Sequence, residues 1–251
     1  MDLEATERNL QAALAAESTD PGRAEVLTQL ARVESVRGRL DFAHSLLDEA
    51  SSLAGDDDVA QARLLLECGR VLRRSDGDAT ALPVLEQAYH AALAAGQHFM
   101  AADAAHSCAL VGDMVAWTNR GLGVAERFDA ARYWRGTLLM NLGDWQWERG
   151  EYEASRKSFE ASLEARRREA RNPQLTEYAR YGLARALRGL GRPAEAIPLL
   201  EEAVKWVEKH PTDPETTEVR QELAAAYDEV GRADEAAAQR AAFERERGGD
   251  P

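Results

Sequence analysis

The sequence has little cysteine, few aromatic residues and few β-branched residues. Only two cysteines occur in 251 residues, Cys68 and Cys108, and aromatic side chains make up 6%. Both cysteines lie within helical patterns, so we expect two buried, reduced thiols and no disulfide framework. Ala, Leu, Glu and Arg dominate the chain instead, and these residues favour helices. The composition therefore predicts an all-α protein.

Basic charge and long apolar runs are also scarce. Lys and Arg number 31 against 44 Asp and Glu, which gives a formal net charge of −13. This balance disfavours general binding to nucleic acids or anionic membranes. No apolar run approaches the roughly 20 residues that span a bilayer, and the N-terminal residues lack the basic-then-apolar order of a secretory signal. We expect a cytoplasmic protein that binds neither nucleic acid nor membranes, and the Ala- and Arg-rich usage is compatible with a GC-rich bacterial genome.

Sequence motifs of catalysis are missing as well. The chain has no phosphate-binding glycine loop, GxSxG elbow, CxxC pair or HExxH motif. His98 and His106 are eight residues apart in a helical pattern, too far to bind one ion together beside Asp103. Asp144 and Glu148 are one turn apart, but that spacing is more typical of a solvated helix face than of an acid–base pair. We predict no enzymatic activity, no metal and no cofactor.

A pair of amphipathic helices recurs along the chain. Its clearest copy runs from Tyr178 to Ala203, with a break at Gly191 and apolar residues at helical spacing on both sides. Similar pairs begin near residues 24, 62, 98, 136, 177 and 217, so the period is 36 to 41 residues. Periods of roughly 20–50 residues are typical of solenoids, in which each unit buries its apolar face against its neighbours.

The repeats resemble the tetratricopeptide repeat over roughly residues 24–245. Small residues recur at positions 8, 20 and 27 of the repeats and Gly at position 15, and the segment from Leu142 to Tyr152 is especially similar. The resemblance implies a single all-α domain over residues 1–251, a right-handed α-solenoid of about thirteen helices. It places an N-terminal capping helix within residues 1–20 and helix pairs near residues 24–57, 62–96, 98–130, 136–171, 177–210 and 217–245.

The third repeat departs from this pattern. Trp117 stands where a small residue is expected, and Gly121 and Gly123 lie inside the second helix of that repeat. Each glycine costs a helix about 1 kcal/mol relative to alanine. We expect this repeat to be the least regular, as a hinge, a pocket or simple sequence drift.

In the tetratricopeptide family the first helix of each repeat lines a concave groove. The resemblance implies that positions 2, 5, 9, 12 and 13 of each repeat face it, and these positions hold seven arginines against six carboxylates. Arginine suits carboxylate or phosphate groups and stacks on aromatic rings. The candidate groove residues are Arg32, Arg63, Arg70, Arg73, Arg74, His106, Asp144, Trp147, Tyr178, Tyr181, Arg185 and Arg188. In the alternative interpretation, the arginines pair with acidic neighbours in the chain, such as Glu67.

The functional hypothesis is a non-enzymatic adaptor or scaffold whose groove binds a peptide segment of another protein, an acidic one if the arginines contact it. The alternative is a regulator of transcription or signalling that senses a small ligand or a peptide. An enzyme is a weaker third hypothesis, and homo-oligomerisation through an end helix stays open.

Overall fold

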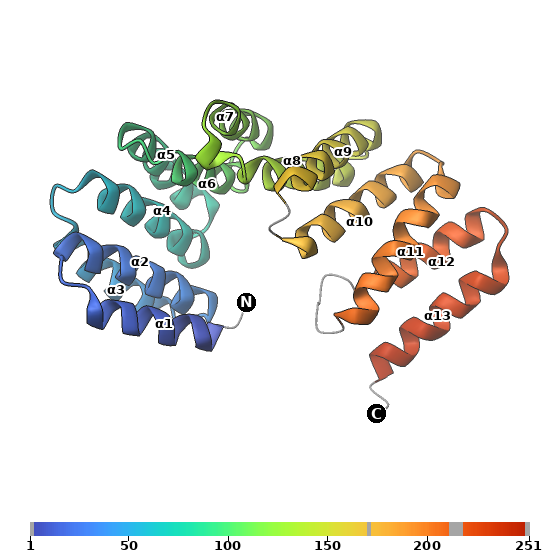
Figure 1. Cartoon of the computed structure of the whole chain (residues 1–251), viewed down its shortest axis with the longest axis horizontal. Helices are drawn as coiled ribbons and strands as arrows, with labels where there is room; N and C mark the ends of the chain where they lie inside the picture. The colour runs from blue at the N-terminus through green and yellow to red at the C-terminus, as the bar shows by residue number, and fades with distance from the viewer. Residues whose placement is uncertain (1–2, 170–171, 211–217, 249–251) are drawn as a thin grey trace. The chain divides into compact units, whose positions relative to one another are not determined.

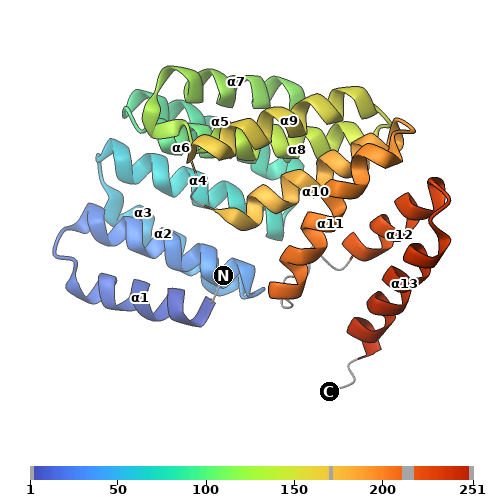
Figure 2. The same ribbon diagram turned by 45° about the vertical axis from the view of Figure 1, so that its right-hand side comes forward.

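The computed structural model describes residues 3–169, 172–210 and 218–248, and within them the chain is helical (Figures 1 and 2). These ranges hold no strand and one 3₁₀ helix, η1 (Asp129–Ala131). The α-helices are α1 (Leu3–Ala16), α2 (Asp20–Val36), α3 (Leu40–Ala54), α4 (Asp58–Ser75), α5 (Asp78–Ala94), α6 (His98–Ala109), α7 (Met114–Arg127), α8 (Trp134–Glu148), α9 (Tyr152–Glu169), α10 (Pro173–Gly189), α11 (Pro193–Lys209), α12 (Val219–Glu229) and α13 (Ala233–Gly248). The predicted all-α repeat fold and its number of helices are confirmed. The predicted boundaries at residues 1, 171 and 217 lie outside the described residues.

Short polar and glycine-containing turns join the helices. Asp57 and Asp113 begin α4 and α7 by accepting hydrogen bonds from first-turn backbone amides, which satisfies donors that a helix start otherwise leaves free. Gly191, the predicted break of the fifth repeat, has φ +69°. A residue with a side chain rarely adopts that backbone conformation.

The chain divides into two compact units, unit 1 (Met1–Trp134) and unit 2 (Arg135–Pro251). The prediction of a single domain stays a prediction. In unit 1, α2 packs on α3 and α4, α4 on α5, and α5 on α6. Small residues permit this close packing: a Cβ atom at Gly69 would lie 2.5 Å from a methyl carbon of Leu85.

Unit 2 is built around Phe159 of α9. Its ring lies between Gly143 of α8 and Gly182 of α10, and a Cβ atom at Gly143 would come within 3.0 Å of it. Ser155, which replaces a small residue of the repeat pattern, is fully buried and donates a hydrogen bond to the Gly143 carbonyl oxygen at 2.8 Å. Phe159 is only 1% exposed, so it lies in the core of unit 2.

The third repeat is more regular than expected. Helix α7 continues through Gly121 and Gly123 without a break, and the irregular segment is η1, which follows it. Trp117 is buried, with its ring edge-on to Tyr89 at 5.3 Å between centroids and Arg120 over it at 4.2 Å. The tertiary burial of α7 therefore offsets its poor helix propensity.

Helix α1 occupies the segment predicted as the capping helix, and it has no fully buried residue. Leu10 and Leu14 pack partly against the core of unit 1, and Arg23 of α2 donates a hydrogen bond to the Leu14 carbonyl oxygen at 3.2 Å. Among the described helices, none combines the length and apolar character needed to cross a membrane.

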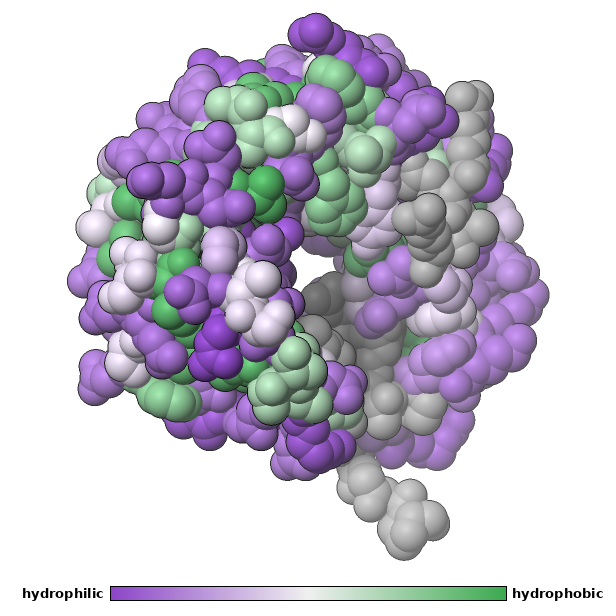
Figure 3. Space-filling view, turned by 60° about the vertical axis from the view of Figure 1, so that its left-hand side comes forward, coloured by the Kyte–Doolittle hydropathy of each residue, from purple (hydrophilic) through white to green (hydrophobic). Residues whose placement is uncertain are grey.

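The surface is mostly hydrophilic. On the face shown in Figure 3, apolar residues form small patches separated by polar ones. Within the described ranges, the exposed large apolar side chains are Val36, Phe42, Phe99, Val115 and Val230.

Candidate functional site

In unit 1 the first helices of successive repeats, α2, α4 and α6, place Arg32, Arg70 and His106 at equivalent positions. Arg70 links two helices, because it donates to Glu67 on its own helix at 2.7 Å and to Asp103 on α6. Both carboxylates are buried. Burial opposes the charge of Arg70, but Asp103 and Glu67 outweigh it and raise the guanidinium pKa above its ordinary value. Arg70 is thus held inside the chain by two ion pairs.

The other candidate arginines of unit 1 differ in how far they are paired. Arg73 donates to Asp78 at 3.1 Å, and Arg32 lies 3.8 Å from Glu67 with 46% of its side chain exposed. Arg63 and Arg74 make no hydrogen bond or ion pair with any described residue. Among the candidate arginines of unit 1, Arg32, Arg63 and Arg74 are therefore the ones available to a partner.

Not every position of the predicted groove faces solvent. Position 5 of the first three repeats is occupied by Thr28, Leu66 and Ala102, and all three residues are fully buried. They pack between helices, so the prediction that position 5 lines a groove is wrong for these repeats.

His106 is half-buried against Trp134, with ring centroids 5.2 Å apart. Burial lowers its pKa to about 4, and the positive charges of Arg70, Arg32 and Arg73 act in the same direction. The imidazole is therefore neutral near pH 7. The ring of His98 instead stacks on that of Phe128, with the two centroids 3.4 Å apart. The described residues contain no cluster of three His, Cys, Asp or Glu that would hold a metal.

An aromatic cluster in unit 1 escaped the sequence analysis. Phe99 lies 6.1 Å from Tyr133 and 5.5 Å from Trp134, and the latter two rings are 5.9 Å apart edge to face. Phe99 stands at position 2 of the third repeat, a predicted groove position, and Tyr133 and Trp134 lie between the predicted third and fourth repeats. The signal was present in the sequence as adjacent aromatic residues in a chain otherwise poor in them.

In unit 2, α8 and α10 bring together Trp147, Tyr181 and Arg185. The Arg185 guanidinium carbon lies 3.5 Å from the Trp147 ring centroid and 5.5 Å from that of Tyr181. Three polar atoms here, Trp147 Nε1, Tyr181 Oη and Arg185 Nε, are buried without a hydrogen-bond partner in the described part of the chain. Burial, with the nearby Glu222 carboxylate, raises the pKa of Tyr181, so the phenol stays protonated. We call these three residues the Trp147 cluster.

The remaining candidates of unit 2 lie around this cluster. Arg188 pairs with Glu222 and Glu229 of α12, the latter at 2.7 Å. Tyr178 accepts a hydrogen bond from Gln174 at 2.5 Å, and Asp144 is half-buried. Arg188 is thus paired within the chain, whereas Arg185 has no ion pair with any described residue.

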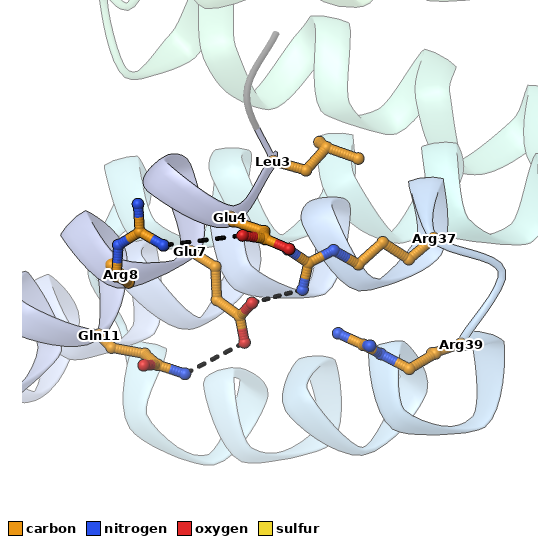
Figure 4. Close-up of a pocket in the computed structure, with 7 residues that line it drawn as sticks. All are labelled: Leu3, Glu4, Glu7, Arg8, Gln11, Arg37 and Arg39. Atoms are coloured by element: carbon orange, nitrogen blue, oxygen red, sulfur yellow. Dashed lines mark hydrogen bonds and ion pairs between the residues drawn. The ribbon is translucent and has the colours of Figure 1, made fainter.

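A pocket of about 780 Å³ lies beside α1, lined by Leu3, Glu4, Glu7, Arg8, Gln11, Arg37 and Arg39 (Figure 4). Its charged groups largely pair with one another. Arg37 donates to Glu7, Gln11 donates to the same carboxylate at 3.2 Å, and Arg8 lies 3.9 Å from Glu4. The hydrogen bond from Arg37 lowers the pKa of Glu7. These contacts fasten α1 to the end of α2 and leave little unbalanced charge for a ligand.

The two thiols are poorly suited to nucleophilic chemistry. Burial raises the pKa of Cys68 to about 11 and that of Cys108 to about 12, with further contributions from neighbouring carboxylates. Both cysteines are free, and each remains a protonated thiol at neutral pH.

The sequence of the second unit matches a known family. Residues 134–205 and 175–239 match the tetratricopeptide repeat. Together the matched segments span residues 134–239. The matched segments include the Gly143, Phe159 and Gly182 contact and the Trp147 cluster. No significant match to a curated protein was found.

Solved structures of similar fold span almost the whole chain. The apo form of RapI has a TM-score of 0.76 at 14% identity, covering 97% of this chain and 70% of that one. The apo form of the quorum sensor NprR from B. thuringiensis has a TM-score of 0.58 at 13% identity, covering 98% and 82%. Aspartyl phosphate phosphatase F from Bacillus subtilis has a TM-score of 0.63 at 13% identity, covering 93% and 62%. At these identities the likeness concerns the fold alone.

Proposed function

We propose that this repeat protein is a non-enzymatic interaction protein that binds a peptide segment of a partner on the first helices of its repeats. The observation that carries the proposal is the Trp147 cluster, where a stacked arginine without a carboxylate partner adjoins two further hydrogen-bond donors. An acidic segment suits it better than a neutral one, because Arg185 carries an uncompensated charge in its unit.

The cluster offers donors and lacks acceptors. The indole N–H of Trp147 and the Nε–H of Arg185 only donate, and the protonated Tyr181 hydroxyl donates readily. A buried donor without an acceptor costs about 1–3 kcal/mol. A peptide supplies acceptors at every backbone carbonyl and at each acidic side chain, so its binding would satisfy these groups. The aromatic rings provide the rigid apolar contact area typical of interaction hot spots.

Other parts of the chain support a binding role more than a catalytic one. The carboxylate of Asp103 accepts a hydrogen bond from Arg70, the thiols of Cys68 and Cys108 stay protonated, and the imidazole of His106 is neutral. None of these four groups therefore combines exposure with the activation that a nucleophile or a general base needs.

A second candidate is a regulator that responds to a peptide signal. It is favoured by the similarity of fold to a structure described as a quorum sensor, which extends over 98% of this chain. In both candidates a peptide binds the first helices of the repeats. The two candidates differ in one respect: in the regulator, peptide binding also changes how this protein interacts with a further protein.

The experiment is a selection from a displayed library of random nonapeptides, followed by titration of the enriched peptides against variants. We expect the protein to enrich acidic sequences, and Arg185→Ala to weaken their binding at least tenfold. Arg180→Ala is the matched control, because Arg180 lies on the same helix but pairs with Glu177, and its change should alter Kd less than twofold. Failure to enrich any sequence, or equal binding by Arg185→Ala, would overturn the proposal.

Tyr181→Phe serves as a second test in case Arg185→Ala is unstable. It removes a single buried oxygen that has no partner in the free protein, so folding should be preserved or slightly improved. Peptide affinity should nevertheless fall several-fold, since one donor to the peptide is lost. An unchanged affinity would remove Tyr181 from the site.

A further inference from the structure

The aromatic cluster of unit 1 combines an exposed ring with half-buried ones. Phe99 is 43% exposed, although large apolar side chains are usually covered in this chain. Its ring is tilted by 58° to that of Trp134 and by 25° to that of Tyr133, and the latter two rings meet at 82°. The cluster therefore presents both ring faces and ring edges, which complement another aromatic ring better than they complement an aliphatic chain.

The cluster also contains an unsatisfied donor. The indole Nε1 of Trp134 is buried and has no acceptor among the described residues. His106, which also contacts the Trp134 ring, is neutral because burial depresses its pKa. A ligand that covers Phe99 and brings a carbonyl oxygen would satisfy the indole N–H while meeting no opposing charge from His106.

Unpaired positive charge lies in register with this cluster. Arg63 and Phe99 occupy the same repeat position on α4 and α6, which are consecutive first helices in contact with each other. Arg74 is three turns beyond Arg63 on the same helical stripe, with Glu67 and Arg70 between them. Neither Arg63 nor Arg74 has a carboxylate partner among the described residues.

We infer that Phe99, Tyr133 and Trp134 form an anchor site for an aromatic side chain of an acidic peptide segment, with Arg63 and Arg74 contacting its carboxylates. The inference rests on the proposed function, because it concerns a peptide bound to the first helices of unit 1. The unpaired charges of Arg63 and Arg74 complement the carboxylates of an acidic peptide.

The test uses fluorescein-labelled nonapeptides of alternating Asp and Ser with Trp, Leu or Ser at the centre, titrated against the full chain by fluorescence anisotropy. We expect the Trp peptide to bind at least tenfold more tightly than the Ser peptide, with Leu between them. Phe99→Ala should abolish this preference. Phe42→Ala is the matched control, because Phe42 is also an exposed phenylalanine of unit 1, 54% exposed on α3. It should leave the preference within twofold.

Failure of the inference can be told apart from failure of the proposed function. If peptides selected from the random library bind Phe99→Ala as tightly as the unchanged protein, the anchor site is wrong and the proposed function stands. If no peptide binds at all, both are wrong. If instead light scattering shows self-association that Phe99→Ala abolishes, a second copy covers the cluster, and the inference is overturned.

Discussion

Pairing with carboxylates of the same chain decides which arginines of the first helices remain available to a partner. Arg70 and Arg185 occupy the same position of different repeats, yet only Arg70 meets carboxylates of its own chain. Arg185 contacts the indole ring of Trp147 instead, so its guanidinium group remains free to pair with a carboxylate of a partner. Of the two interpretations of these arginines that the sequence left open, internal pairing describes Arg70 and Arg188, whereas partner binding remains a proposal for Arg185.

His106 should make folding stability depend on pH. Its pKa is about 4 in the folded chain and 6.5 ordinarily, so between these values the unfolded state binds more protons and acid favours unfolding. Between pH 7 and pH 5 this residue alone should remove about 2 kcal/mol from the free energy of unfolding.

The measurement is urea unfolding at several pH values, comparing the unchanged protein with His106→Gln. The variant should lose less stability on acidification, whereas His90→Gln, at an exposed position of α5, should follow the unchanged protein. Parallel pH profiles for all three proteins would contradict the assignment.

The limits of sequence reasoning at this scale are visible in two contacts. Arg70 and Asp103 form an ion pair although they are 33 positions apart in the sequence. Helical periodicity shows which face of its helix each residue occupies, but it does not show which side chains of two neighbouring helices meet. The contact of Phe99 with Trp134 depends on the path of the chain through η1, a segment with no repeat pattern. Residues that pack at fixed repeat positions, such as Leu183 and Leu200, were in contrast predictable from spacing alone.

Among the elements, α1 is attached mainly by polar contacts. It buries no residue fully. Its link to α2 includes the ion pair of Glu7 with Arg37 (Figure 4) and the hydrogen bond from Arg23 to the Leu14 carbonyl oxygen. Polar contacts at a surface are weaker than apolar burial and are screened by salt. The capping helix should therefore open more readily than the repeats that it covers.

We expect Glu7→Ala to speed amide hydrogen exchange in α1 several-fold while leaving α4 and α5 unchanged. Glu4→Ala is the control, since Glu4 lies 3.9 Å from the exposed Arg8 and is itself largely exposed. Raising the salt concentration should speed exchange of α1 in the unchanged protein more than in Glu7→Ala. Equal exchange in all three proteins would show that apolar contacts of Leu10 and Leu14 hold the helix.

Helix α7 shows where element-level prediction failed. Two glycines in a 14-residue helix suggested an irregular segment, yet α7 is continuous. The propensity cost of about 1 kcal/mol per glycine is smaller than the gain from burying Trp117 and Val124. Local preference was outweighed by tertiary packing, which a single sequence does not display.

At the scale of the whole molecule, each repeat contacts chiefly its neighbours. Stability in such proteins is close to a sum of local terms, so damage should remain near its origin. Leu66 in unit 1 and Leu200 in unit 2 are both fully buried, and replacing either by alanine should cost about 2–5 kcal/mol.

Hydrogen exchange followed by mass spectrometry checks this expectation. Leu66→Ala should reduce protection in α2 to α6 more than in α10 to α13, and Leu200→Ala should show the opposite pattern. The two variants serve as controls for one another. A uniform loss of protection in both would indicate a single cooperative domain, as the sequence analysis predicted.

Phe159, wedged against Gly143 and Gly182, constrains how this chain can diverge. A methyl group at Gly182 would collide with the ring, and one at Gly143 would crowd it, so an alanine is accommodated best after a smaller residue has replaced the phenylalanine. The reverse order leaves a cavity. The three positions are therefore epistatic, and in related sequences they should coevolve as a linked set, although Gly143 and Gly182 stand 39 residues apart.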